Sequence, residues 1–212
     1  MLILTLFLSL LPPSSSAGPS LVFTTDSPGY ARLEDIAVDE DLTFSLKFKT
    51  GTREAQLLYM RETTAGHQIS LSLSDGGLHL QVHPDTSIGP LNEDSGEIVR
   101  LDDEDWHEVY ITLNGGRFKF IAFKVDDTEI FKSVSQLPLL SNAVYQTWFG
   151  GIPPSLSEES QAPYVGCIRD IRVLDTDRDL QDLQLTGATV EECYSSSEHS
   201  SHPHCQSFCQ DR

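Results

Sequence analysis

Alternation of apolar and polar residues runs through this chain from Leu21 to Val173 and restricts it to an all-β fold. The segment Thr43 to Lys49 alternates as a half-buried strand does. Ile69 to Ser74 and Leu78 to Val82 alternate on either side of Asp75-Gly76-Gly77, which is typical of a hairpin turn. About ten or more short strands joined by such turns predict an antiparallel β-sandwich of jelly-roll type.

Two segments near the end of this pattern are predicted to close the sandwich. The segment Trp148 to Pro154 predicts the end of a buried strand, because glycines adopt backbone angles that other residues avoid and prolines cannot donate to a ladder. Cys167 to Val173 then predicts a last strand that is half covered by the core. Beyond it, Leu180, Leu183 and Leu185 fit either a helical turn or an extended crossing. Other predicted strands are Leu57 to Tyr59, Ile98 to Leu101, Trp106 to Leu113, Arg117 to Val125 and Thr128 to Lys132.

The first 17 residues have the features of a signal peptide. Met1 to Leu11 is an apolar run too short to span a bilayer, and Ser15 and Ala17 are small residues with the spacing that a signal peptidase requires. We therefore expect cleavage after Ala17 and an extracellular location, either secreted or as the ectodomain of a longer membrane-anchored product. The alternative, a buried N-terminal strand, would place the Pro-Ser patch against a core. No later apolar stretch is long enough to span a membrane, so we expect no direct membrane insertion.

All four cysteines lie in the last quarter of the chain. In an oxidising compartment they are disulfide partners rather than free thiols. A bridge between Cys167 and Cys193 would close a loop of about 25 residues and stabilise the fold by roughly 3 to 4 kcal/mol on loop-entropy grounds. Residues 18–193 are then one domain, and residues 194–212 form a polar tail or linker, rich in Ser and His, with almost nothing to bury.

The formal net charge is −18, from 32 acidic and 14 basic residues. Such a field repels phosphate backbones and anionic head groups, so nucleic acid, heparin-like glycans and membrane surfaces are poor partners. The charge serves either the solubility of a secreted domain or the steering of a basic partner or divalent cations.

A set of motifs in this order resembles the laminin G-like family, whose fold is a concanavalin-like sandwich. The resemblance covers Leu21 to Cys193, and one departure is Asp105 before Trp106, where the family more often has glycine. The motifs that carry it are Leu21 to Phe23, Leu42 to Lys49, Leu57 to Tyr59, Ile69 to Val82, Asp105 to Val109, Trp148 to Pro154 and Gly166 to Val173.

Within the family, the chain resembles the first laminin G-like domain of a neurexin-like receptor. This rests on a signal peptide that runs directly into the domain, on Gly150 to Pro154 and on Ile168 to Val173. Cys193, Cys205 and Cys209 follow where neurexins begin a module like epidermal growth factor; the alternatives are a fragment of a longer receptor or a tail that folds differently. The resemblance implies a non-catalytic module that binds an extracellular or cell-surface protein in adhesion, matrix contact or synaptic receptor contact.

The resemblance also implies a calcium site at one rim of the sandwich. The family's ligand positions fall on His67, the carbonyl of Pro84, Leu140 and Asn142. Calcium needs oxygen ligands, which makes His67 a poor one, and Asp85 lies close enough to Pro84 to substitute. Calcium is the only cofactor implied, and the alternative is a solvated rim without an ion. The same loops, at His67, Asp85 and Asn142, are where the family's partner surfaces lie.

Two other classes of function remain open. A glycan hydrolase on the same sandwich needs paired carboxylates facing one cleft. The acids from Asp102 to Asp105, with Glu108, are mostly consecutive and precede a strand, as in a charged turn, so no catalytic residue is predicted and Trp106 is expected in the core. A soluble carrier of a small apolar ligand, as in steroid-binding relatives, needs an apolar pocket between the sheets.

A soft-metal site in the tail is a further alternative, since histidine and cysteine are the ligands that zinc prefers. In a secreted chain such cysteines more often pair, and histidines in a Ser-rich tail are solvated. The residues concerned are His199, His202, His204, Cys205 and Cys209.

Overall fold

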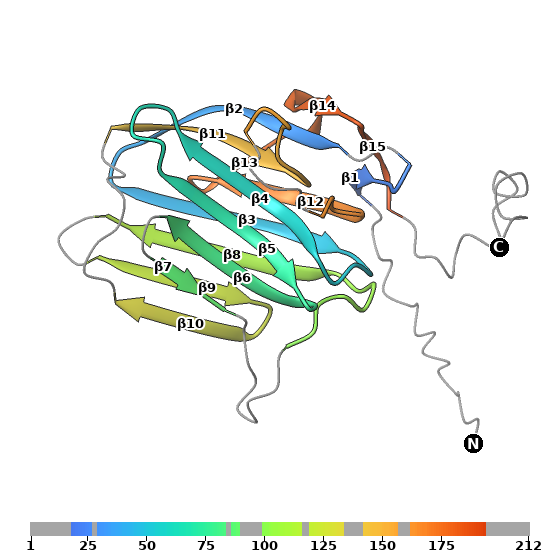
Figure 1. The fold of residues 1–212 in the computed structure, drawn as a ribbon, viewed down its shortest axis with the longest axis horizontal. Coiled ribbons are helices and arrows are strands. Elements are labelled where there is room, and N and C mark those ends of the chain that lie inside the picture. The colour runs from blue at the N-terminus through green and yellow to red at the C-terminus, as the bar shows by residue number, and fades with distance from the viewer. Residues whose placement is uncertain are drawn as a thin grey trace, which may run out of the picture.

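The computed structural model describes residues 18–26, 29–83, 86–89, 99–115, 119–133, 142–156 and 162–193. They form two antiparallel sheets stacked face to face (Figure 1). The predicted all-β sandwich of jelly-roll type is confirmed. The predicted signal peptide, residues 1–17, and the tail, residues 194–212, lie outside the described residues.

The first sheet has eight strands, in the order β10-β9-β8-β3-β12-β1-β15, with β13 paired to β12. Their bounds are Pro19–Phe23 for β1, Asp41–Lys49 for β3, His107–Asn114 for β8, Phe120–Val125 for β9, Thr128–Ser133 for β10, Gly166–Val173 for β12, Thr176–Asp177 for β13 and Ala188–Glu192 for β15.

The second sheet has seven strands, in the order β14-β2-β11-β4-β5-β6-β7. Their bounds are Tyr30–Val38 for β2, Ala55–Glu62 for β4, Gln68–Ser74 for β5, Gly77–His83 for β6, Thr86–Ile88 for β7, Ala143–Phe149 for β11 and Gln184–Thr186 for β14.

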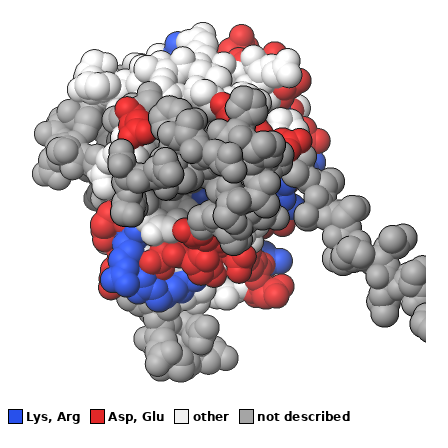
Figure 2. Space-filling model, turned by 90° about the vertical axis from the view of Figure 1, so that its right-hand side faces the viewer, with Lys and Arg blue, Asp and Glu red and all other residues white. Residues whose placement is uncertain are grey.

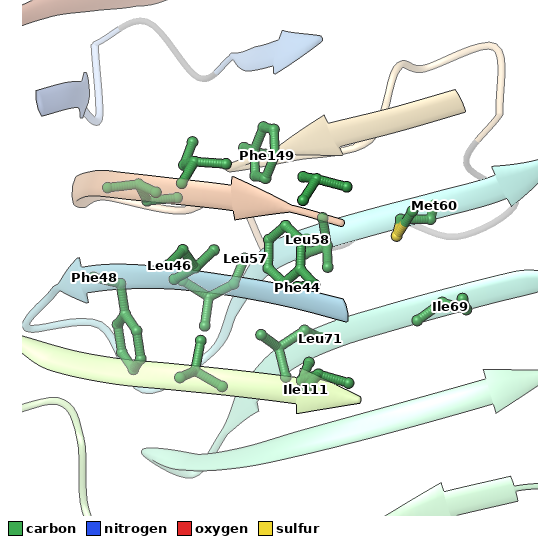
Figure 3. Close-up of a cluster of buried hydrophobic side chains, with 14 of the residues drawn as sticks. Phe44, Leu46, Phe48, Leu57, Leu58, Met60, Ile69, Leu71, Ile111 and Phe149 are labelled. Carbon is green, nitrogen blue, oxygen red and sulfur yellow. The ribbon is translucent and has the colours of Figure 1, made fainter. Parts of the chain in front are cut away.

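Alternate residues of the two sheets fill the space between them. From β3, Phe44 and Phe48 belong to one buried cluster with Leu71 and Phe149 of the other sheet (Figure 3). The rings of Phe44 and Phe149 stack with their centroids 5.9 Å apart. Burying each such side chain contributes about 1.5 to 3 kcal/mol, so this interior supplies most of the driving force for folding.

The strand end predicted at Trp148 to Pro154 is confirmed. Strand β11 ends at Phe149, and Gly150 follows with φ 78°. A Cβ at Gly150 would collide with the ring of Phe23, so this position needs glycine for both its backbone angle and its close approach. The prediction that Cys167 to Val173 is the last strand is wrong, because β13, β14 and β15 follow it and β15 pairs with β1.

Other predicted elements differ in detail. Residues Val99 to Leu101 were expected in a strand but form a loop. This loop lies against the turn between β5 and β6, where the Leu101 N–H donates to the Gly76 carbonyl at 3.0 Å. The helical turn and the extended crossing left open after Asp175 both occur. A short 3-10 helix, Leu180–Asp182, is capped by the Asp179 carboxylate, which accepts from the Gln181 N–H at 2.9 Å, and β14 follows it.

The predicted bridge between Cys167 and Cys193 is present and joins β12 to the residue after β15. It lies beside β1, since Cys167 is opposite Val22 in the register of β1 and β12. The bridge therefore fastens the final segment to the middle of its sheet.

Candidate partner-binding rim

The predicted partner-binding rim is one end of the seven-stranded sheet. Here β4 ends at Glu62 and β11 begins, with Tyr145 opposite Glu62 in the register. The Thr63 N–H donates to the Val144 carbonyl at 2.9 Å, and the Glu62 N–H donates to the His67 carbonyl at 2.8 Å. These bonds place the turn after β4 against the start of β11. We call Glu62 to His67 together with Asn142 to Tyr145 the rim.

One buried carboxylate holds the rim turn in place. Glu62 is only 5% exposed, and its oxygens accept the backbone N–H groups of Thr64 at 2.7 Å, of Ala65, and of Gly66 at 3.0 Å. Burial favours the neutral acid, but these donors outweigh it and hold the pKa of Glu62 below its ordinary value. The turn is thus organised around a negative charge that lies inside it.

Tyr145 lies behind this turn with its ring fully buried. Its hydroxyl has no hydrogen-bond partner within the described part of the chain, and the same holds for the buried hydroxyl of Thr147. Burial, together with the nearby negative charge of Glu62, raises the pKa of Tyr145 to about 12. The phenol therefore stays neutral at physiological pH.

The structure places two of the predicted rim residues and leaves the others outside its described ranges. His67 is partly buried and closes the turn after β4, and its Nδ1 is buried without a partner in the described residues. Asn142 is exposed just before β11, with φ 55°. Because the turn and the start of β11 are bonded to each other, both residues belong to the same rim. Pro84, Asp85 and Leu140 lie outside the described residues.

The described part of the rim does not fit a calcium ion. Within the described ranges, no group of three or more His, Cys, Asp or Glu side chains is placed to hold a metal. The carboxylate of Glu62 already accepts backbone N–H groups, and His67 offers nitrogen where calcium needs oxygen. The amide oxygen of Asn142 is of the ligand type that calcium accepts.

The opposite end of the sandwich, where β5 ends and β8 begins, is organised by side-chain charges. Figure 2 shows Asp and Glu gathered beside Lys and Arg on this face. Asp102 is held by Arg100 at 2.6 Å and by Arg53 at 3.5 Å. The hydrogen bond from Arg100 lowers the pKa of Asp102 despite its burial. We call this region, which comprises Arg53, Asp75, Arg100 to His107 and Asp126, the charged end.

A buried histidine is the centre of the charged end, and sequence reasoning missed it. His107 bridges two carboxylates, with Nδ1 2.8 Å from Asp126 and Nε2 3.0 Å from Asp103. Burial disfavours the imidazolium, but the two carboxylates outweigh it and raise the pKa of His107. The only sequence signal is the motif Trp106-His107, since Asp126 is far away along the chain.

The acids that a hydrolase would need are therefore engaged in structural contacts. Asp102 and Asp103 bind the arginines and His107 rather than face each other across a cleft. The prediction that Trp106 lies in the core is wrong. Its ring is partly exposed beneath the guanidinium of Arg169, which lies 4.1 Å from the ring centroid, as in a cation–π pair.

Two cavities lined by described residues are mostly polar, unlike the apolar pocket that a carrier of apolar ligands needs. One, of about 290 Å³, has walls that include Glu34, Asp35 and Asp182. The other, of about 390 Å³, lies on the outer face of the seven-stranded sheet and is lined mostly by polar side chains. Among the described residues, no helix is long and apolar enough to cross a membrane.

Comparisons with known proteins agree with this fold. The sequence model of the family described as "Laminin G domain" matches residues 48–176. The chain is similar to the LG1-3 region of the laminin alpha2 chain, with 18% identity and a TM-score of 0.63 over 82% of this chain and 30% of that chain. It is also similar to domains LG4-5 of the mouse laminin alpha1 chain, with 23% identity and a TM-score of 0.66 over 84% of this chain and 47% of that chain.

A third similar structure is the native heptameric SAP-like pentraxin from Limulus polyphemus. It is 14% identical with a TM-score of 0.57, over 77% of this chain and 79% of that chain. At these identities the three structures show a shared fold alone. The chain spans less than half the length of the two laminin structures.

Proposed function

We propose that this chain, which belongs to the laminin G domain family, is an extracellular, non-catalytic module that binds a cell-surface or matrix protein through its rim. Laminin G domains are typically extracellular binding modules and are generally non-catalytic. The neurexin-like motifs of the sequence support a role in adhesion or receptor contact, and the predicted signal peptide supports secretion.

The observation that carries this proposal is the turn held by Glu62. A partner surface binds more tightly when its loops are already ordered, because less conformational entropy is lost on association. Three backbone N–H groups bonded to one buried carboxylate fix the turn before any partner arrives. The side chains of Thr63, Thr64 and Ala65 are exposed on its outer side, where a partner can contact them.

A matched pair of variants tests the rim. The full secreted chain is screened against a library of cell-surface receptor and matrix ectodomains, and each binder is then titrated with Thr63→Arg and Thr189→Arg. Both threonines are exposed, but Thr63 lies in the rim and Thr189 on β15 of the other sheet. We expect Thr63→Arg to weaken binding at least about tenfold, which corresponds to about 1.4 kcal/mol, and Thr189→Arg to leave it unchanged. Binding that only Thr189→Arg weakens, or a screen without any binder, contradicts the proposal.

Calcium dependence is decided in the same experiment. Calorimetric titration of the chain with calcium, and thermal unfolding with calcium or with chelator, measure whether an ion binds. The described rim residues predict no heat of binding and no change in melting temperature. Binding of calcium would assign the site to oxygens that include Asp85, and the partner titrations would then be run with calcium present.

A further inference from the structure

A second surface lies away from the rim, on the outer face of the seven-stranded sheet. It is a depression of about 390 Å³ at the point where β14, β2 and β11 lie side by side, at the top of the view in Figure 1. In the register, Tyr30 is opposite Thr186, while Arg32 is opposite both Gln184 and Trp148. Side chains from three neighbouring strands therefore converge on one place. We call it the outer depression.

The loop after β11 forms a fixed wall of the outer depression. A Cβ at Gly151 would lie 2.7 Å from the carbonyl oxygen of Gly29, so glycine is needed for the loop to lie against the chain that enters β2. Further along, the Leu156 N–H donates to the Pro153 carbonyl at 2.8 Å, and Pro153 is buried. The wall is therefore shaped without a ligand, as in most small-molecule sites.

The lining combines aromatic rings with unused polar groups. Trp148 is 4% exposed and packs on Tyr59 with ring centroids 5.8 Å apart, so it is a rigid floor. The side chains of Gln146, Ser155 and Thr186 line the depression and make no hydrogen bond to another residue within the described ranges. Polar side chains that can donate and accept hydrogen bonds thus surround an aromatic floor.

The described lining of the outer depression carries little charge, in a chain whose net charge is −18. Arg32 is the charged residue of its lining, and the guanidinium already donates to Asp35 at 2.8 Å and to Gln184 at 3.4 Å. No carboxylate is among the described residues of the lining. This composition disfavours an ionic ligand, whether acidic or basic, and favours an uncharged polar one.

We propose that the outer depression binds a neutral oligosaccharide, separately from the protein-binding rim. A sugar ring presents an apolar C–H face, which suits an aromatic ring, and a rim of hydroxyl groups, which suits amide and hydroxyl side chains. The volume lies within the range of small-molecule sites, about 300 to 1,000 Å³. Tyr30 and Gln146 are the residues that contact the sugar.

The chain offers a reporter for this site, because it contains two tryptophans and Trp106 lies elsewhere. In Trp106→Phe, fluorescence comes from Trp148 alone. The full chain with this change is titrated with the neutral tetrasaccharide of two N-acetyllactosamine units, up to about 10 mM. We expect saturable fluorescence changes with a Kd of about 1 mM or tighter, as for a small shallow site. Adding Gln146→Ala or Tyr30→Ala should weaken binding at least about tenfold.

Gln81→Ala is the matched control, since Gln81 is exposed on β6 of the same sheet but lies outside the depression. It should leave the Kd unchanged, and a near-ultraviolet circular dichroism spectrum of each variant checks its folding. A flat titration in the folded parent overturns the proposal, and so does binding that Gln146→Ala leaves intact. Preferential binding of a heparin tetrasaccharide, or of an uncharged peptide, would assign the depression to another class of ligand and also overturns it.

Discussion

At the rim, one buried carboxylate holds a turn through backbone N–H groups, whereas at the charged end side chains of both signs hold the loops together. Glu62 needs no cation, because its partners are the N–H groups of the turn that follows it. His107 instead lies between Asp103 and Asp126, which come from two different loops. The two ends of one sandwich therefore depend on pH and salt in different ways.

This difference determines the pH at which each end loses its stabilising contacts. Backbone N–H groups do not titrate, so the hydrogen bonds that hold the rim turn persist until Glu62 itself is protonated, at a pH below its lowered pKa. The charged end depends on His107, whose two carboxylate partners raise its pKa, so its positive charge is lost as pH rises through that raised pKa. A partner that binds at the rim therefore meets the same turn across the physiological range of pH.

The largest effect is expected from Cys193→Ser, which removes the bridge to Cys167 at the charged end. On the loop-entropy estimate the free energy of unfolding falls by about 3 to 4 kcal/mol. Urea denaturation of the variant, and of the reduced wild-type chain, measures it. Because the rim turn contains no bridge, partner binding by the folded variant should be unchanged. A loss of less than about 1 kcal/mol would show that β15 is held by its hydrogen bonds alone.

Glu62→Gln should have the next largest effect, about 2 to 3 kcal/mol, since an amide replaces a charged acceptor among buried N–H donors. Glu54→Gln is the matched control, because Glu54 accepts the Asp75 N–H at 2.6 Å in an exposed position. Its loss should stay below about 1 kcal/mol. Equal losses in the two variants would mean that burial does not distinguish the rim carboxylate.

The effect of His107→Gln should depend on pH. The folded pKa is raised above the unfolded value of about 6.5, so the stabilisation is fully present below about pH 6.5 and is lost as pH rises through the folded pKa. At pH 6 the variant should be less stable by about 1 to 2 kcal/mol, and the deficit should shrink by pH 9. Thermal and urea unfolding across this range measure it, with His79→Gln as control. A deficit that is the same at both pH values argues against a charged His107.

The smallest effect is expected from Arg53→Gln at the charged end. Arg53 is exposed and its contacts with Asp75 and Asp102 are 3.8 Å and 3.5 Å long, so the loss should be below about 1 kcal/mol. Salt at 1 M should remove most of it, because the Debye length falls to about 3 Å. The rim variant Glu62→Gln should lose the same free energy at low and high salt, and a salt-dependent loss there would break the contrast between the two ends.

Much of the fold could be predicted from the sequence, because most strands have one buried and one exposed face. Strand β3 is an example, with Phe44 and Phe48 inward and polar residues outward. Strand β2 was missed because its alternation is interrupted at Glu34 and Asp35, both exposed, where the register of β2 and β11 shifts. Strand β15 was missed because most of its side chains are at least partly exposed.

The resemblance pointed to His67 and Asn142, and the structure places His67 in the turn after β4 and Asn142 in the loop before β11, but that the two form a partner surface stays a prediction. The residue that holds this turn could not be predicted. Glu62 reads as an ordinary surface residue at the end of a strand. Its burial arises from the packing of β4 against β11, which alternation does not encode. The weak signal is an acid followed by small residues, Thr64 to Gly66, whose N–H groups are free to turn back to it.

The bridge between Cys167 and Cys193 also decides how the domain bears tension. Strands β1 and β15 run antiparallel with Pro19 opposite Glu192, so a pull that separates residues 18 and 193 would open their hydrogen bonds one after another, as a zipper opens. The bridge carries that load past β15 directly into β12, which is the other neighbour of β1. Since forced unfolding is governed by the unfolding rate, a reduced chain should unravel from this corner at much lower force than an oxidised one.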